Sequence, residues 1–136
     1  MTAPVVDAQP FADAISTALT SQGIAHAEGR KPTVAAGLPY IVWWLDAGTV
    51  EDRSLRSRDG FSLVLVLQCY GLSVDAVRFA VRKGRSAVLS LSHAAVGGRV
   101  LMVPEHSPGP PMSRDDDADP PIWWQSDEWR LRTSPA

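Results

Sequence analysis

The sequence predicts an α+β fold, with a small, mainly antiparallel four-stranded sheet and two helices packed on one face. Three observations lead to this prediction. Residues 38–45 and 61–70 are apolar on both sides of an alternating pattern, which is typical of strands covered on both faces. Residues 10–21 and 73–91 carry apolar side chains at helical spacing. The segments then follow the order helix, strand, strand, helix, strand, strand, which favours an α+β domain.

Length and composition bound the class of protein. A chain of 136 residues is the size of one domain, and we expect residues 1–136 to form it. The net charge of -2 gives no overall basic excess that would recruit nucleic acid. The single cysteine, Cys69, rules out an internal disulfide and a cysteine zinc cluster. Because we find no signal peptide and no apolar run long enough to cross a bilayer, we expect a soluble protein made inside the cell, with no membrane partner.

The first third of the chain begins with a helix. Pro10 suits the first turn of a helix, and Gly23 suits its end. Residues 24–27 are predicted to form a short strand, and residues 28–37 a polar loop. Residues 38–45 then form the first strong strand.

The middle of the chain holds the segment around which the rest is organised. Residues 46–60 are predicted to be a long, polar connection of mixed charge. Residues 61–70 follow it, so we expect this strand to pair antiparallel with residues 38–45. Ser73 is a good N-cap for the next helix. Gly84 is a weak point inside that helix, which costs roughly 1 kcal/mol relative to alanine.

The last third is predicted to add two strands. Residues 99–103 form a strand that Pro104 stops, after a turn at residues 97–98. Residues 106–121 are rich in proline and aspartate, and we expect no regular structure there. Residues 122–133 form the last strand, and because one of its sides is mostly polar we expect an edge or half-exposed strand.

The second face of this sheet raises the main functional question. Two helices can cover one face, and the sequence offers no third helix for the other. A large exposed apolar patch usually marks a partner surface, and aromatic residues are enriched at such surfaces. The alternative is that the long loops fold back and bury this face. The candidate residues for a subunit or partner interface are Trp43, Trp44, Val64, Val66, Phe79, Trp123, Trp124 and Trp129.

A search for metal-ligating patterns gives little. The three histidines share no helical or strand spacing, so a metal pair is unsupported. Asp115, Asp117 and Asp119 have the spacing of the first ligands of a calcium loop. However, Pro120 occupies the position that needs glycine, and Ser126 stands where the bidentate glutamate belongs. We therefore predict no metal and interpret these residues as a surface loop.

Catalytic patterns are also missing from the sequence. Neither Gly97-Gly98 nor Ala47-Gly48 has the strand–glycine–helix pattern of a phosphate loop, and no serine stands in a nucleophile elbow. Arg78, Arg82 and Arg85 fall on one side of the second helix, where they could contact DNA phosphate, an acidic neighbour or only solvent. We predict no enzymatic activity and no cofactor.

Several segments together resemble a known family. They are residues 38–42, the strand 59–70 that leads into the helix 75–89, and the acidic, proline-rich segment 114–124 followed by residues 129–131. In these segments the chain resembles the tail-terminator (minor tail) proteins of long-tailed phages that infect actinobacteria. The likeness covers most of the chain from about residue 38 onward.

The resemblance implies a structural protein of the virion. Proteins of this family form a ring, usually a hexamer, on the last ring of the tail tube protein. The ring stops tube growth and offers a surface to the head-tail connector or head-closure protein, at the neck of a particle assembled in the host cytoplasm. DNA passes through the lumen without specific binding.

A cyclic ring uses a heterologous interface, in which one patch meets a different patch of the neighbour. An acidic or neutral lumen would let DNA slide, whereas a basic lumen would bind it. We therefore expect some of the acidic loop residues to face the lumen. The candidates are Glu51, Asp52, Asp115, Asp116, Asp117 and Asp119.

Two alternatives stay open at this point. The chain is another neck component, such as a head-closure or tail-completion protein, or it is a small-ligand-binding or enzymatic α+β domain. In the last case the pocket would lie under the connection formed by residues 46–60.

Overall fold

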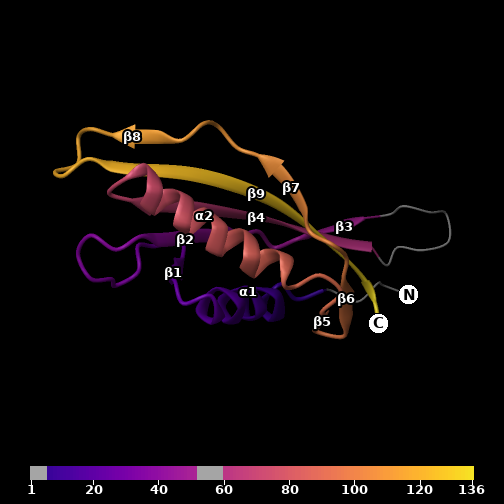
Figure 1. Ribbon diagram of the computed structural model, residues 1–136. Coiled ribbons are helices and arrows are strands. Elements are labelled where there is room, and N and C mark those ends of the chain that lie inside the picture. Colours follow the sequence, from indigo (N-terminus) through magenta and orange to yellow (C-terminus); the bar gives the residue numbers. More distant parts are fainter. Residues whose placement is uncertain (1–5, 52–59) are drawn as a thin grey trace.

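Two helices lie side by side on one side of a long sheet in the computed structural model (Figure 1). The structure describes residues 6–51 and 60–136, and within them it has two helices and nine strands. In chain order these are α1 (Gln9–Ser21), β1 (Ala25–Glu28), β2 (Tyr40–Leu45), β3 (Thr49–Glu51), β4 (Gly60–Gly71), α2 (Val74–Leu89), β5 (Ala95–Val96), β6 (Arg99–Leu101), β7 (Glu105–Pro108), β8 (Ser113–Asp115) and β9 (Ile122–Pro135).

The sheet is larger than the sequence suggests, and it is mixed. Its main path runs β1-β2-β4-β9-β6-β5, while β3 pairs with β4, and β7 and β8 pair with β9. Strand β1 is parallel to β2, and the other pairings are antiparallel. The six strands of the main path curl into a half-barrel. The expected small four-stranded sheet is therefore wrong, because short strands of two to four residues show no usable periodicity in the sequence.

The largest correction concerns the proline-rich segment and the last strand. Residues 106–121, expected to lack regular structure, contribute to β7 and β8. These strands, together with β6, pair with one side of β9, while β4 pairs with its other side. Strand β9 is therefore central, so the expected sheet edge is wrong. The other alternative, a half-exposed strand, is confirmed, because the polar side chains lie on an uncovered face. Proline is tolerated in β7 because this strand is itself an outer strand.

The main elements of the sequence prediction are confirmed one by one. Helix α1 begins and ends within one residue of the expected bounds, and Ser73 caps α2 by accepting a hydrogen bond from the Ala76 N–H at 3.1 Å. Strands β2 and β4 pair antiparallel as expected. The connection at residues 46–60 differs, because it contains β3.

The core lies between the two helices and the sheet. Strand β4 contributes Leu63, Leu65 and Leu67, which are fully buried. Gly84 of α2 faces this layer, and a Cβ there would lie 3.0 Å from Leu67 Cδ1 and 3.2 Å from Ile41 Cδ1. The glycine therefore lets the helix approach the sheet closely, which explains why a poor helix former stands at this position.

Candidate interaction surface

Opposite the helices, the sheet presents a face that we call the open face. Side chains alternate along a strand, so those between the buried leucines of β4 point to this side. No helix of the described residues lies over it (Figure 1). Its main side chains are Tyr40, Val42 and Trp44 from β2, Val64, Val66, Gln68 and Tyr70 from β4, and Trp124, Ser126, Glu128, Arg130 and Arg132 from β9.

An aromatic row crosses one end of the open face. Tyr40, Tyr70 and Trp124 are register partners on three adjacent strands. The two tyrosine rings stack with centroids 5.0 Å apart, and the Tyr70 hydroxyl donates to Gln68 Oε1 at 2.6 Å. Burial raises the pKa of both tyrosine hydroxyls, so they stay protonated and neutral near pH 7. The row is therefore uncharged.

Part of the open face is covered by the chain itself. The segment that joins β1 to β2 carries Lys31, whose Nζ lies 5.4 Å from the Tyr40 ring centroid. It also carries Gly29, where a Cβ would lie 3.7 Å from Trp44 Nε1. Val42 is buried, whereas the Trp44 side chain is 41% exposed and Val66 beside it is half-buried. Within the described residues, the alternative of loops folding back therefore holds at the β2 border.

The β9 side of the open face is charged. Glu128 and Arg130 are exposed there. Arg132 Nη1 donates to Glu105 Oε1 at 2.9 Å, which joins β7 to β9. The open face thus combines an apolar and aromatic half on β2 and β4 with a charged half on β9, as protein interfaces commonly do.

The structure divides the predicted interface residues among four places. Trp44, Val64, Val66 and Trp124 share the open face. Trp43 and Trp129 lie in the core, each 3% exposed, so neither offers surface to a partner. Trp123 is half-buried on the helix side of the sheet with Arg114 over its ring. Phe79 is 40% exposed on the outer side of α2, beneath Arg82 and Lys83.

The predicted lumen residues fall mostly in one turn. Asp115, Asp116, Asp117 and Asp119 are exposed where β8 leads into β9. Within the turn, the Asp117 N–H donates to Asp115 Oδ1 at 3.0 Å, and Asp116 forms an ion pair with Arg114. Glu51 ends β3, and Asp52 lies outside the described residues. The pocket expected under residues 46–60 involves residues 52–59, which also lie outside them.

An ion pair with a buried carboxylate was not anticipated from the sequence. Asp127 is 1% exposed, and Arg85 donates to its two carboxylate oxygens at 2.8 and 3.1 Å. His106 Nε2 lies 3.1 Å from Asp127 Oδ1. Burial alone would raise the pKa of Asp127, but the hydrogen bonds from Arg85 and His106 outweigh it and lower that pKa. The usable signal was the alternation that puts Asp127 on the same side of β9 as Trp129 and Leu131.

The other titratable groups give no sign of a reaction centre. Among residues 6–51 and 60–136, no three His, Cys, Asp or Glu side chains are placed to hold a metal ion. Cys69 is buried, and burial raises the pKa of its thiol, which therefore stays protonated. No helix in this part of the chain is long and apolar enough to cross a membrane.

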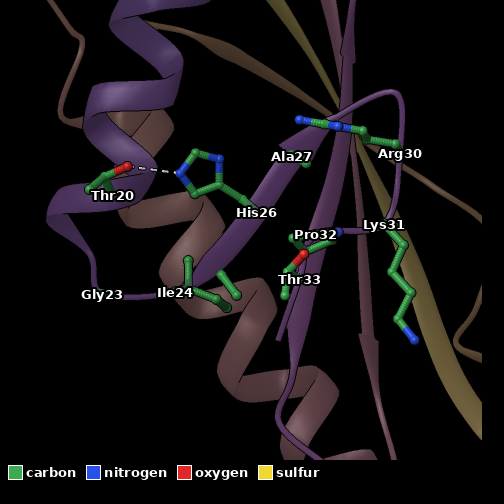
Figure 2. A pocket seen from close by; sticks show the side chains of 10 residues that line it. Thr20, Gly23, Ile24, His26, Ala27, Arg30, Lys31, Pro32 and Thr33 are labelled. Atoms are coloured by element: carbon green, nitrogen blue, oxygen red, sulfur yellow. Dashed lines mark hydrogen bonds between the residues drawn. The ribbon is translucent and has the colours of Figure 1, made fainter. Parts of the chain in front are cut away.

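A cavity of about 550 Å³ lies beside β1, between the end of α1 and the segment that follows β1 (Figure 2). His26 stands in its wall, with its Nε2 at 2.9 Å from Thr20 Oγ1, and its Nδ1 accepts from Trp43 Nε1 at 3.3 Å. Burial lowers the pKa of His26, so the ring is neutral near pH 7. Among the described residues that line the cavity, Arg30 and Lys31 supply the charges and none is a carboxylate.

Comparisons with known proteins support the fold. No protein-family profile matches the chain, and no curated protein matches its sequence. The fold is similar to a chain in a solved structure described as "Virion of native gene transfer agent (GTA) particle", with a TM-score of 0.68 and 16% sequence identity. The match covers 96% of this chain and 99% of the other. The likeness in fold therefore extends over nearly the full length of both chains.

Proposed function

We propose that this chain is a structural component of a phage-like virion. The observation that carries the proposal is the shared fold, which matches a chain of a gene transfer agent virion over nearly the full length of both chains. The sequence resemblance to phage tail proteins supports the same class. At 16% identity the comparison itself gives the fold, and the virion role is our inference from it.

We propose further that the chain is a tail terminator. It forms a ring, usually of six copies, that seats on the last ring of the tail tube protein and ends tube polymerisation. Its other surface joins the tail to the head-tail connector or head-closure protein at the neck. It acts by occupying a surface, without catalysis or a cofactor, while DNA passes through its lumen.

The open face supports an assembly role. Trp44, Val64 and Val66 leave apolar area in contact with solvent on one side of the sheet. Aromatic residues and arginine are enriched at protein interfaces, and this face carries both. We propose that this face contacts another virion component.

The test is capping of tail tubes in vitro. The purified chain is added to the growing tail tube protein encoded by the same genome, and tube lengths are measured by negative-stain electron microscopy. A terminator shortens the tubes and leaves a ring at one end of each. A chain that stays monomeric in mass photometry and leaves tube length unchanged would contradict the proposal.

The runner-up is a head-closure or tail-completion protein, which the same fold and open face would also suit. This protein would bind the connector ring or the finished tail without changing tube length. Mixing the chain with the purified connector, followed by sedimentation, separates the two roles.

A further inference from the structure

Strand β1 is an outer strand of the sheet with one side unpaired. Within the described residues it pairs only with β2. The Gly29 N–H donates to the Trp43 carbonyl at 2.8 Å. Backbone groups alternate in direction along a strand, so the N–H groups of His26 and Glu28 point away from β2. Such an edge is a template for a strand from another chain.

The surface beside β1 is hollowed along its length. The cavity of about 550 Å³ described above adjoins another of about 340 Å³ on the α1 side, and His26, Ala27 and Arg30 line both. Figure 2 shows Arg30 beyond the end of β1, with Lys31, Pro32 and Thr33 following beside the strand. A groove next to a free strand edge is the geometry in which an extended segment adds to a sheet.

The opposite border of the sheet is formed by β7 and β8, and it is level with β1. Ala25 is level with Ser113, because Tyr40, Tyr70 and Trp124 are the register partners on the strands between them. In the same way, Glu28 is level with Pro108, with Trp43, Leu67 and Asp127 as the register partners between them. Residues 25–28 at one border are therefore level with residues 108–113 at the other.

The strand directions of the two borders also fit. Strands β2 and β9 are both antiparallel to β4, β1 is parallel to β2, and β7 and β8 are antiparallel to β9. Strands β7 and β8 therefore run opposite to β1. A second copy that continued the sheet past β1 would add its own β7–β8 border in an antiparallel direction.

The two borders carry opposite charge. Residues 104–121 hold five acidic side chains and one basic side chain, whereas residues 20–37 hold two basic side chains and one acidic side chain. Arg30 and Lys31 are exposed, and neither has an ion pair with another described residue. Arg30 lies beyond the Glu28 end of β1, whereas Lys31 Nζ lies over the Tyr40 ring, level with Ala25. Opposite charges on two surfaces steer their encounter and disfavour the wrong pairing of like borders.

We propose that β1 of one copy receives the β7–β8 border of a second copy, so that the acidic turn at residues 115–119 lies beyond the Ala25 end of β1, on the side of the Lys31 ammonium. This inference rests on the proposed ring and names its subunit contact. Each copy uses both borders, so the contact is heterologous and repeats from copy to copy. It assigns the acidic turn to the subunit boundary instead of the lumen.

The first test blocks the free edge of β1 without breaking its pairing with β2. Glu28→Pro removes an N–H that points away from β2, and Glu28→Ala is the matched control that keeps it. We expect Glu28→Pro to weaken self-association at least about tenfold, the loss that one backbone hydrogen bond gives, while Glu28→Ala assembles like the wild type. Sedimentation velocity gives the association constants, and circular dichroism melts show that both variants are folded.

The second test exchanges the charges. Lys31→Glu and Asp117→Lys/Asp119→Lys each bring like charges together at the Ala25 end of β1, so each alone assembles at least about tenfold more weakly. An equimolar mixture restores assembly, because the reversed β1 border of one variant then meets the reversed turn of the other. Arg78→Glu/Arg82→Glu on α2 is the control that assembles normally.

The outcomes separate this inference from the proposed function. If the wild type forms rings and Glu28→Pro and both charge variants form them equally well, the assigned contact is overturned while the ring stands. If the charge mixture fails to restore assembly although both variants are folded, the assignment is also overturned. A wild type that forms no assembly, with or without the tail tube protein, overturns both.

Discussion

Asp127 shows how a single charged residue can hold several elements together. Its carboxylate accepts hydrogen bonds from Arg85 of α2 and lies within hydrogen-bond distance of His106 of β7, while the residue itself belongs to β9. A buried charge is tolerated only when its partners satisfy it. The arrangement therefore ties the proline-rich segment and the second helix to the central strand.

Replacing this carboxylate tests how much it contributes to the stability of the fold. We expect Asp127→Asn to lower the free energy of unfolding by about 1–2 kcal/mol, because the buried side chain loses its charge-assisted hydrogen bonds, while water reaches the partly exposed Arg85 guanidinium. Urea denaturation followed by tryptophan fluorescence measures the loss. The neighbouring Glu128→Gln, exposed on the open face, should change stability by less than about 0.5 kcal/mol.

The same residue predicts a pH dependence. The pKa of Asp127 is lower in the folded chain than the ordinary value of 3.8, so its ionised form stabilises the fold above that value. This contribution is lost as the pH falls from about 4 through the lower folded pKa. Urea midpoints measured from pH 6 to pH 3 should fall more steeply for the wild type than for Asp127→Asn. Parallel curves would show that Asp127 is not the group responsible.

Gly84 shows how one element depends on its neighbour. Its missing side chain lets α2 approach Leu67 and Ile41 at distances that leave little room for a further carbon atom. We expect Gly84→Val to lower the free energy of unfolding by about 2 kcal/mol through overpacking. Thermal melts measure the change, and Ser86→Val on the exposed side of the same helix is the control. If Gly84→Val loses no more stability than Ser86→Val, the close approach of α2 to the sheet does not limit the packing at this position.

The long elements could be predicted from the sequence because each repeats its pattern several times. Alternation over residues 61–70 and helical spacing over residues 73–91 recur often enough to identify β4 and α2. Strands β5, β7 and β8 have two to four residues, and their existence depends on pairing with another strand, which local sequence does not report. The sheet was underestimated for that reason.

The open face could likewise be predicted only where a long strand repeats its alternating pattern. Alternation alone places Val64 and Val66 opposite the buried leucines of β4, and the structure agrees. It cannot say which of Trp43 and Trp44 faces the helices, because both sides of β2 are apolar. Asp127 was missed since its neighbours along β9 are polar, which hid the single buried charge among exposed ones.

At the scale of the whole molecule, the sheet borders and the open face suggest two separate roles. If neighbouring copies continue the sheet through β1 and the β7–β8 border, the open faces of all copies lie on the same side of that sheet. Trp44, Val64 and Val66 of successive copies then form one apolar belt. The borders would close the ring, and the belt would remain available to another virion component.

Two aromatic side chains with nearly equal exposure can test this division. Trp44 is 41% exposed on the open face, and Phe79 is 40% exposed on the outer side of α2. We expect Trp44→Glu to form rings in mass photometry but to cap tail tubes at least about tenfold less well, since a charge would enter an apolar contact. Phe79→Glu should form rings and cap tubes like the wild type.

The result of this pair also locates the partner surface. A capping defect in Phe79→Glu alone would place the contact on the helix side and overturn the role of the open face. Loss of ring formation in Trp44→Glu would mean that the open face lies between copies, so that ring closure and capping use the same surface. Only a ring-competent, capping-deficient Trp44→Glu, set beside a ring-deficient Glu28→Pro, supports the separation of the two roles, because each defect then follows from a different side of the same sheet.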